Sequence, residues 1–493
     1  MIYPDKKEFI NKTREGNLIP VYREILADLE TPLSAFLKLK GKTGFLLESV
    51  EGGDKWARYS FIGSNPSLTI EGKGRNIIIK KGGVRKKVSF VKDPLEVISA
   101  ELNKFRPVII PGLPRFFGGF VGYIGYDTVR YFEKIPDSKH KGLNLPDLFL
   151  MLTDTMLVFD NLNQTIKVIS NAYTEGRSPD EAYERAIEKI DLIVSKLMKR
   201  VPLPKKRSKP GNKLNKSFTS NFEKEAFKKA VVRAKEYVKA GDIIQAVISQ
   251  NFEREVDINP LNAYRALRVI NPSPYMFYLQ TGKCTLVGSS PEVLVRLEED
   301  RVELRPIAGT RRRGRNEDED DKLEKELRAD PKELAEHIML VDLGRNDVGR
   351  VAETGSVKVT ELMNVERYSH VMHIVSNVTG RLADGHNAFD VLRASFPAGT
   401  VTGAPKIRAM EIIEELEPVR RGPYAGCVGY FDFSGNMDMC ITIRTIIFKG
   451  EKAYIQAGAG IVADSDPESE YMETVNKAKG MFKAIEMAET DLS

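Results

Sequence analysis

The sequence predicts an α+β fold in which large antiparallel β-sheets pack as a sandwich with helices on the outside. Strand-like runs rich in β-branched and aromatic residues follow one another directly, as in YMFYLQTG (275–282) and CTLVGSS (284–290). Helical periodicity is restricted to separate segments such as 178–200 and 468–488. Because the strand runs are adjacent and hairpin-like, antiparallel pairing is favoured over a Rossmann or barrel fold.

The composition is that of a globular protein of 493 residues, 42% hydrophobic and 29% charged. The net charge of +6 is too small for this length to indicate nucleic-acid binding by itself. The three cysteines (Cys284, Cys427, Cys440) are widely spaced and form neither a disulfide framework nor a zinc pattern. The N-terminus lacks a secretory signal, and no apolar run approaches a membrane span. We therefore expect a cytoplasmic protein with no membrane contact.

Residues 1–200 begin with helical material and then become rich in strands. GFLLESV (44–50) and RYSFIGSNPSLTI (58–70) are typical of strands, and NIIIKKGGVRKKVSF (76–90) predicts a hairpin that turns at Gly82 and Gly83. Residues 147–171 predict a strand, a turn and a second strand. The segment 178–200 has a Ser-x-x-Glu start and helical periodicity, so it predicts a helix.

The stretch KRVPLPKKRSKPGNKLNKS (199–217) contains three prolines, many basic residues and no acidic one. A basic nucleic-acid-binding arm is one interpretation, but no aromatic residue is interleaved for base stacking. A flexible connection between domains is favoured. The predicted division is an N-terminal region at 1–200, a linker at 201–217 and a C-terminal region at 218–489.

The C-terminal region opens with an amphipathic helix that ends at Gly241, followed by a strand. Further strands are predicted within 275–309, 357–382 and 425–460. Interspersed helices are predicted at 332–342, 386–395, 404–415 and 468–488.

Two pairs of glutamates have the i, i+3 spacing that places both carboxylates on one helix face. Glu333 and Glu336 lie in DPKELAEHIMLVDLGRNDVGR (330–350), where Asp330 and Pro331 predict the helix start. Glu470 and Glu473 form the second pair. A solvated helix face is the ordinary interpretation of such pairs. Four carboxylates without a Cys/His cluster would also suit Mg²⁺, with substrate oxygens completing its shell.

Nine motifs make a more specific interpretation possible. In chain order they are DIIQAVISQ, SSPEVLVRL, RPIAGTRRRG, ELAEHIMLVDLGRNDVGR, YSHVMHIVS, GTVTGAPKIRAMEII, RRGPYAG, CITIRT and GAGIVADSDPESEYMETVNKA. Together they resemble the chorismate-utilising enzymes, most closely the anthranilate synthase component I family. GTVTGAPK alone is similar to a phosphate loop, but it lacks the GK[ST] ending. FLLES (45–49) extends the resemblance into the N-terminal half, which would be the regulatory part beside a C-terminal chorismate-binding part.

The resemblance implies roles for individual residues. It implies Mg²⁺ on Glu336 and Glu473, supported by Glu333 and Glu470. It implies that Glu292 protonates the departing ring hydroxyl, although a buried structural glutamate is the alternative, and that His373 acts in the elimination of pyruvate. The implied substrate contacts are Gly309, Thr310, Thr400, Tyr424, Arg444, Gly458, Ala459 and Gly460. Thr400 and Gln245 are counted with the catalytic residues, and Arg444 is expected on a strand.

Two positions distinguish the products within the family. Relatives that make aminodeoxychorismate carry a nucleophilic lysine in PIKGT, where this chain has Ala308 in PIAGT. Relatives that add water carry a lysine base where this chain has Gln245. The resemblance therefore implies ammonia as the nucleophile and anthranilate as the product, in the first committed step of tryptophan biosynthesis. Aminodeoxychorismate synthase component I is the alternative, and a catalytically silent tryptophan-binding module is a third interpretation.

The chain has no recognisable glutaminase portion, so the resemblance implies a separate glutamine amidotransferase subunit, anthranilate synthase component II. We expect a heterotetramer of two large and two small subunits. We expect no nucleic-acid partner. Feedback inhibition by L-tryptophan is also implied. The family's inhibitor site matches Glu48, Ser49, Pro274, Tyr275 and Met276.

Overall fold

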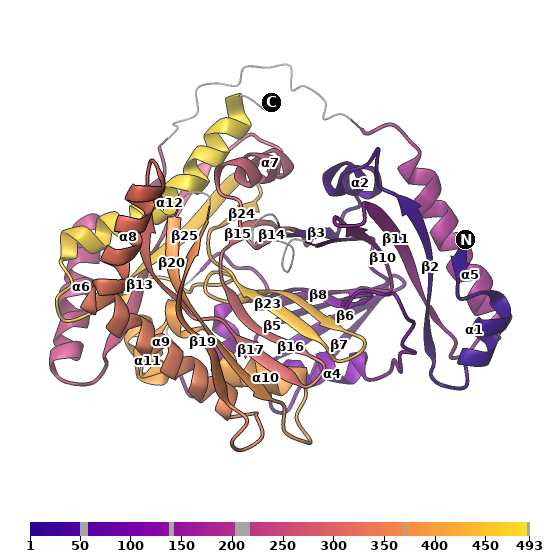
Figure 1. The fold of residues 1–493 in the computed structure, drawn as a ribbon, viewed down its shortest axis with the longest axis horizontal. Helices are drawn as coiled ribbons and strands as arrows, with labels where there is room; N and C mark the ends of the chain where they lie inside the picture. Colours follow the sequence, from indigo (N-terminus) through magenta and orange to yellow (C-terminus); the bar gives the residue numbers. More distant parts are fainter. Residues whose placement is uncertain (50–57, 138–141, 203–216, 369–370, 491–493) are drawn as a thin grey trace.

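The computed structural model describes residues 1–49, 58–137, 142–202, 217–368 and 371–490. Two large antiparallel sheets form its centre, and most helices lie outside them (Figure 1). The predicted α+β sandwich is thereby confirmed.

The first sheet contains thirteen strands. In spatial order they are β1 (Ile2–Tyr3), β2 (Leu18–Leu26), β11 (Thr165–Tyr173), β10 (Thr155–Asp160), β4 (Tyr59–Ser64), β3 (Gly44–Glu48), β14 (Tyr275–Gln280), β15 (Thr285–Ser290), β24 (Thr445–Lys449), β25 (Lys452–Ile461), β13 (Gln245–Glu255) and β12 (Thr219–Ser220), with β21 (Gly403–Ala404) also beside β13.

The second sheet contains twelve strands. Their order is β18 (Ile307–Arg312), β20 (Val371–Arg381), β17 (Arg301–Leu304), β16 (Val293–Glu298), β23 (Met437–Ile441), β22 (Cys427–Asp432), β8 (Gly119–Ile124), β9 (Leu148–Thr153), β5 (Leu68–Lys73), β6 (Asn76–Lys81) and β7 (Val84–Ser89), with β19 (Lys358–Arg367) also beside β20.

Aromatic side chains join the two sheets at the centre of the core. Phe61 of β4 in the first sheet packs edge-on against Tyr430 of β22 in the second, with ring centroids 6.1 Å apart. Phe116 stacks on Tyr430 at 4.1 Å and contacts Phe61 edge-on at 5.2 Å. These contacts belong to one hydrophobic cluster that extends through both sheets. Burial of such apolar surface is the main favourable contribution to folding.

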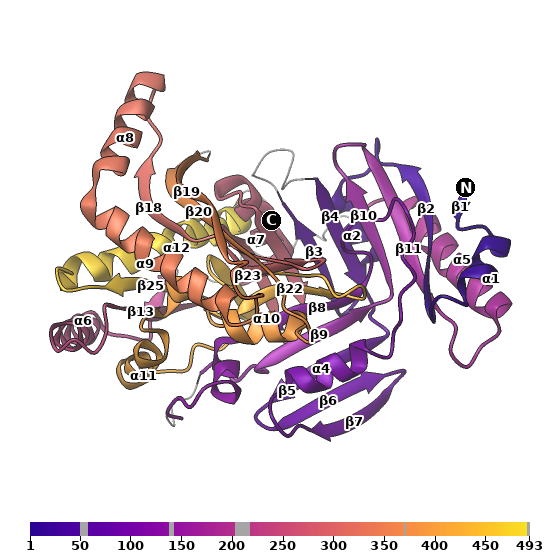
Figure 2. The same ribbon diagram turned by 60° about the horizontal axis from the view of Figure 1, so that its bottom comes forward.

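The helices cover the outer faces and ends of the sandwich. They are α1 (Lys6–Lys12), α2 (Pro32–Leu39), α4 (Leu95–Leu102), α5 (Pro179–Leu197), α6 (Lys224–Lys239), α7 (Pro260–Ile270), α8 (Glu317–Ala329), α9 (Pro331–Gly349), α10 (Ala388–Ser395), α11 (Lys406–Leu416) and α12 (Pro467–Thr490), with short 3₁₀ helices η1 (Tyr126–Tyr131) and η2 (Gly399–Val401). Helix α5 packs on β11 and β2, whereas α9 packs on β20 and β18. Helix α8 projects from the body of the molecule (Figure 2). No helix among the described residues is both long and apolar enough to cross a membrane.

Both sheets take strands from the two halves of the chain. Strand β3 pairs with β14, placing Glu48 opposite Met276, and β8 pairs with β22. Residues 203–216 of the predicted linker lie outside the described residues. The division into regions at 1–200 and 218–489 stays a prediction.

Most of the predicted elements are present, with some differences. The hairpin at 76–90 is confirmed as β6 and β7, and Ser178 caps α5 in a capping box with Glu181. Residues 147–171 form three consecutive strands rather than two. Strand β9 belongs to the second sheet, and the chain crosses at Asp154 to the first sheet, where it forms β10 and β11. Helices α2, α4, α7 and α8 were not among the predictions. Helices α2 and α4 have only eight residues, which is shorter than the window over which a helical period can be recognised, and α8 is almost entirely charged.

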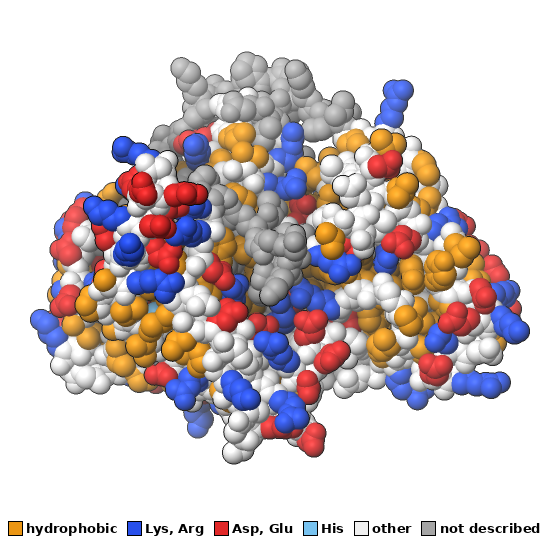
Figure 3. Space-filling model, in the orientation of Figure 1, with side chains coloured by type: hydrophobic (Ala, Val, Ile, Leu, Met, Phe, Trp, Pro, Cys, Tyr) orange, Lys and Arg blue, Asp and Glu red, His pale blue; other side chains and the backbone are white. Residues whose placement is uncertain are grey.

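The visible surface around α8 carries charges of both signs (Figure 3). Arg312 pairs with Glu319, and Arg367 lies 2.9 Å from Glu324. This mixture agrees with the small net charge of the chain.

Candidate active site

A cavity of about 580 Å³ lies where the two sheets meet α9 and α12. It gathers fourteen of the fifteen residues predicted for catalysis, substrate binding and metal binding, although they are spread over more than 200 positions of the sequence. The residues predicted from the sequence that line this cavity are Gln245, Glu292, Gly309, Thr310, Glu333, Glu336, His373, Thr400, Tyr424, Arg444, Gly458, Gly460, Glu470 and Glu473. Ala459 does not line it.

Two helices bring the four glutamates to this cavity. Asp330 caps α9 by accepting hydrogen bonds from the Lys332 N–H at 3.0 Å and the Glu333 N–H at 3.4 Å. The i, i+3 spacing then places Glu333 and Glu336 on the face of α9 that lines the cavity. Glu470 and Glu473 reach the same cavity from α12.

The carboxylates influence one another inside the cavity. Burial raises the pKa of Glu336, and the neighbouring Glu333 and Glu473 raise it further. Burial also raises the pKa of Glu470, again with a contribution from Glu473. Two of the four carboxylates have cationic partners, since Glu333 lies 2.8 Å from Arg311 and Glu473 lies 2.7 Å from Lys477.

These carboxylates fit a hard cation that takes part of its shell from another molecule. Within the described ranges, no group of three or more His, Cys, Asp or Glu side chains is arranged as a metal cage. Mg²⁺ is commonly bound by one or two carboxylates, with water and substrate oxygens in the remaining positions. Glu336 and Glu473 supply such a pair, and their mutual repulsion is what a divalent cation would relieve.

Glu292 lies between β15 and β16, where the chain passes from the first sheet to the second. Glu292 is partly buried in the wall of the cavity, and this burial raises the pKa of its carboxyl to about 7. The Thr400 hydroxyl and the Lys477 ammonium lower that pKa, but burial has the larger effect. A carboxyl with a pKa near neutrality can hold a proton and release it to a substrate.

His373 of β20 is oriented by a bulge in β18. The register between β18 and β20 shifts between Ala308 and Thr310, so Gly309 projects its carbonyl towards the imidazole. The His373 Nδ1 lies 3.0 Å from the Gly309 carbonyl oxygen and 3.1 Å from the Thr310 Oγ1. A carbonyl can only accept, so the proton is assigned to Nδ1 and the Nε2 lone pair is free. Burial lowers the pKa of His373, which favours this neutral form.

The glycines of β25 make room for other side chains of the site. A Cβ at position 460 would lie 2.3 Å from the Gln245 Nε2, and one at position 458 would lie 2.9 Å from the Tyr424 hydroxyl. Ala459 has the opposite orientation. It pairs with Ile248 of β13, and its side chain belongs to a hydrophobic cluster with that residue.

Gly458 and Gly460 of β25 line the cavity, as do Gln456 and Ala457, whereas Ala459 does not. The Val247 N–H donates to the Thr402 carbonyl and the Ser249 N–H to Glu417, both on the side away from β25. In an antiparallel ladder the backbone groups of successive residues point to alternate sides. The N–H and C=O of the intervening Ile248 therefore point towards β25, where they pair with those of Ala459. The expected Ala459 N–H contact with substrate is therefore not available.

Arg444 lines the cavity but does not lie on a strand as expected. It occupies the bend between β23 and β24 with φ of 49°, a left-handed conformation that a strand does not contain. Its Nη1 donates to the Lys477 carbonyl at 3.0 Å, which directs the guanidinium across the cavity wall. Burial lowers the pKa of Arg444. It raises the pKa of Tyr424 to about 12, so the Tyr424 hydroxyl keeps its proton near neutrality.

Several lining residues were missed from the sequence. Lys477 donates to Glu473 at 2.7 Å and to the Gly458 carbonyl at 3.0 Å. Its i+4 spacing from Glu473 was a signal that could have identified it. Lys332, Val247 and Gln456 also line the cavity. For these three residues the sequence offers no comparable signal.

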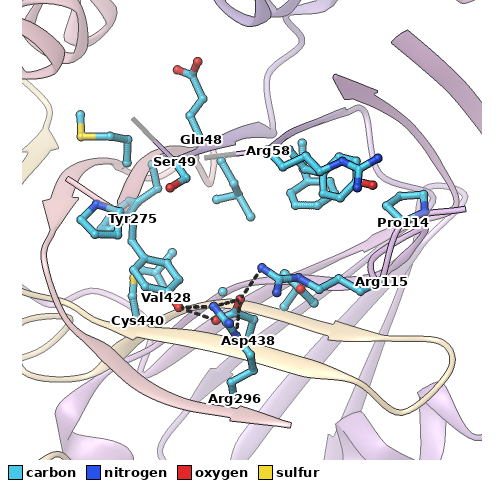
Figure 4. Close-up of a pocket in the computed structure, with 18 of the residues that line it drawn as sticks. Glu48, Ser49, Arg58, Pro114, Arg115, Tyr275, Arg296, Val428, Asp438 and Cys440 are labelled. Carbon is cyan, nitrogen blue, oxygen red and sulfur yellow. Dashed lines mark hydrogen bonds and ion pairs between the residues drawn. The ribbon is translucent and has the colours of Figure 1, made fainter. Parts of the chain in front are cut away.

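A second cavity of about 440 Å³ contains all five residues predicted for inhibitor binding (Figure 4). Asp438 lies on its floor, 3.0 Å from Arg296 and 3.3 Å from Arg115, and accepts a hydrogen bond from the Tyr275 hydroxyl at 2.8 Å. The Glu48 side chain points away from the cavity, where it contacts Tyr264 and lies 3.3 Å from Arg268. Apolar walls and a charged floor suit a small amphipathic ligand.

Comparison with known proteins agrees with this geometry. The family described as chorismate binding enzyme matches residues 46–483. Anthranilate synthase component 1 from Acetivibrio thermocellus is 51% identical over 495 residues, covering 99% of both chains. The protein of the same name from Aquifex aeolicus is 53% identical over 490 residues, covering 98% of both chains.

Solved structures show the same likeness. The crystal structure of anthranilate synthase component I from Streptococcus pneumoniae matches with a TM-score of 0.76 and 38% identity, covering 93% of this chain and 99% of that one. The menaquinone-specific isochorismate synthase from Escherichia coli shares the fold, with a TM-score of 0.69 and 20% identity over 97% of this chain and 99% of that one.

The chain therefore belongs to the family of chorismate-binding enzymes. Within that family it resembles anthranilate synthase component 1 along practically its whole length.

Proposed function

We propose that this chain is the large subunit of an anthranilate synthase, which converts chorismate and ammonia into anthranilate, pyruvate and water. The observation that carries the proposal is the identity of two cavity residues. Gln245 and Ala308 both line the cavity, at the positions where the family's water-adding and aminodeoxychorismate-forming members are expected to carry lysines. Free ammonia is already a nucleophile, so it needs neither a lysine base to activate it nor a lysine to act as a covalent nucleophile in its place.

The first step joins ammonia to the ring as the ring hydroxyl leaves. Glu292 holds the proton that the departing hydroxyl requires, and Thr400 lies beside it. The Gln245 side chain donates to Glu336, while its Oε1 has no partner among the described protein atoms and is free to accept from the incoming ammonia. Proton donation by a positioned carboxyl accounts for about 10²- to 10⁴-fold in rate.

The second step removes pyruvate and a ring proton, which makes the ring aromatic. The free Nε2 of His373 is the base in the cavity suited to this step. Arg444, Tyr424 and the N–H groups of Gly458 and Gly460 bind the substrate carboxylates. Glu336 and Glu473 would hold Mg²⁺, with Glu333 and Glu470 in support. When bound, the cation supplies Lewis-acid polarisation next to the ring carboxylate.

An assay for fluorescent anthranilate tests this proposal. The purified chain is incubated with chorismate, Mg²⁺ and ammonium at alkaline pH, with and without EDTA. We expect a fluorescent product that disappears with EDTA. Chorismate consumption without fluorescence would instead support the alternative, aminodeoxychorismate synthase component I.

The relatives are named component 1, which supports a component 2 partner for this chain as well. We propose a glutamine amidotransferase subunit that delivers ammonia, in a cytoplasmic heterotetramer of two large and two small subunits. Adding that subunit with glutamine should replace the ammonium requirement, and the mass of the purified complex gives the stoichiometry.

We assign L-tryptophan to the second cavity as a feedback inhibitor. The ring fits the apolar walls formed by residues such as Met276 and Pro274, and the charged groups around Asp438 and Arg115 suit an amino acid's ammonium and carboxylate. Inhibition of the anthranilate assay by tryptophan, together with a thermal shift of the protein, tests this assignment.

A further inference from the structure

Arg421 and Glu417 form a buried ion pair directly behind the wall of the candidate active site. Their side chains are 1% and 4% exposed. The pair is bidentate, with the Arg421 Nε donating to the Glu417 Oε2 at 2.9 Å and Nη2 donating to Oε1 at 2.6 Å. Neither residue lines the cavity, so neither is placed to touch a substrate.

The guanidinium joins two segments of the cavity wall. Its Nη1 donates to the Val401 carbonyl at 2.7 Å, and its Nη2 donates to the Val247 carbonyl at 2.7 Å. Val401 directly follows Thr400, which lies beside Glu292, and Val247 is two residues from Gln245. The same guanidinium therefore fixes the 3₁₀ turn η2 against β13.

The carboxylate extends this connection to a third segment. The Glu417 Oε1 accepts hydrogen bonds from the Ser249 N–H and from the Ser249 hydroxyl, each at 2.7 Å. The Ser249 Oγ in turn accepts from the Gln456 Nε2 at 2.8 Å. Gln456 lies on β25 and lines the cavity.

The pair takes the place of a neighbouring strand. On this side of β13, β21 pairs only with Gln245 and Ala246, and β12 only with Phe252 and Glu253. The backbone groups of Val247 and Ser249 lie between these two short pairings. Because buried backbone groups require partners, the ion pair satisfies positions that would otherwise lack them.

Two aromatic rings hold the guanidinium between them. Its carbon lies 4.8 Å from the ring centroid of Tyr126 and 5.6 Å from that of Tyr424. The first contact anchors Arg421 to η1 of the N-terminal half. The second reaches Tyr424, which is itself a cavity residue.

We infer that Arg421 and Glu417 are positioning residues, which hold Thr400, Tyr424 and Gln456 in register around the reacting atoms. This inference rests on the proposed function. Misplacing catalytic groups by about 1 Å can cost on the order of 100-fold in rate. Loss of the pair should therefore lower kcat more than it weakens substrate binding.

The variant Arg421→Lys tests the inference on the full chain. Lysine keeps the charge, but one ammonium cannot serve Glu417 and two carbonyls in the geometry of a guanidinium fork. The matched control is Arg393→Lys. Arg393 forms a bidentate pair with the buried Asp93, at 2.8 and 3.1 Å, and neither residue lines the cavity. Anthranilate formation is measured below the unfolding temperature of each variant.

We expect kcat of Arg421→Lys to fall about tenfold or more, with KM for chorismate changed by less than about threefold. Arg393→Lys should keep kcat within about twofold, even if its thermal midpoint falls. A parent-like kcat in folded Arg421→Lys overturns the inference, as does an equal loss in both variants.

If Arg421→Lys does not fold, the variant Ser249→Ala tests the inferred positioning role instead. It leaves the ion pair intact but removes the hydroxyl that links Glu417 to Gln456. A fall in kcat of about threefold or more at unchanged KM supports the inference, and a parent-like kcat overturns it. An inactive parent chain is a different failure, because it overturns the proposed function before any variant is compared.

Discussion

The Glu292 carbonyl oxygen accepts a hydrogen bond of 3.0 Å from the Ile441 N–H. Glu292 lines the candidate active site, and Ile441 directly follows Cys440, which lines the second cavity. Strand β16 also pairs with β23 at Val293 and Cys440. The second cavity is therefore lined by residues of β16 and β23, and Glu292 of the candidate active site directly precedes β16. A ligand that displaces β23 in the second cavity would move the backbone at the proposed proton donor.

Glu292→Gln should lower kcat by about 10²- to 10⁴-fold, since glutamine cannot donate the proton. The pKa of Glu292, raised to about 7, adds a pH dependence in the parent chain. At saturating free ammonia, kcat/KM for chorismate should fall as the pH rises through about 7, because the donor of the free enzyme loses its proton. A kcat/KM that stays constant from pH 6 to 8 would contradict this role.

The same pKa predicts a stability change. The folded pKa lies above the usual 4.5, so the contribution of Glu292 is most favourable below pH 4.5 and is lost as the pH rises through about 7. At pH 8 the buried charge costs up to about 3 kcal/mol. Glu292→Gln should therefore unfold at higher temperature than the parent at pH 8, with the difference shrinking towards pH 5.

Glu336→Gln should abolish turnover and leave the fold intact, because it removes one of the two proposed magnesium ligands. Far-UV circular dichroism checks the fold. The readout of metal binding is the rise in thermal midpoint on adding Mg²⁺, which the variant should lose. Glu451→Gln, in an exposed turn, is the control and should keep the full shift. Full activity in Glu336→Gln would disprove the metal assignment.

Gly460→Ala should disturb the site through Gln245, since its Cβ would lie 2.3 Å from the Gln245 Nε2. We expect the KM for ammonia to rise, together with a loss of stability of about 1–3 kcal/mol from overpacking. Gly480→Ala in α12 is the matched control, because its Cβ would meet no atom within 4 Å. That control should be neutral or up to about 1 kcal/mol more stable. Equal kinetics in both variants would show that Gln245 does not depend on Gly460.

Ser49→Phe should fill part of the second cavity, because the serine is one of the residues that line it (Figure 4). We expect the tryptophan concentration for half inhibition to rise about tenfold or more, at an unchanged basal rate. Ser49→Ala preserves the space and should change inhibition much less. If both variants are inhibited like the parent, tryptophan binds elsewhere.

Much of the fold and site could be predicted from local sequence signals. The cap at Asp330 and the i, i+3 glutamates predicted α9 and its charged face, because helix geometry depends on neighbouring residues only. The hairpin at Gly82 and Gly83 was equally local. The motifs predicted the site residues through resemblance, but they did not give the distances between those residues in the folded chain.

The tertiary structure decided what depends on distant partners. The sequence alone determined which residue types are present, the α+β class, the periodic helices and the family resemblance. Only the fold placed Gln245 against Gly460, turned Ala459 into the β13 ladder and set Arg444 in a left-handed bend. Only the fold buried Arg421 between β13 and η2 and raised the pKa of Glu292. Burial, strand register and electrostatic surroundings arise from segments far apart in the chain, so local sequence patterns do not specify them.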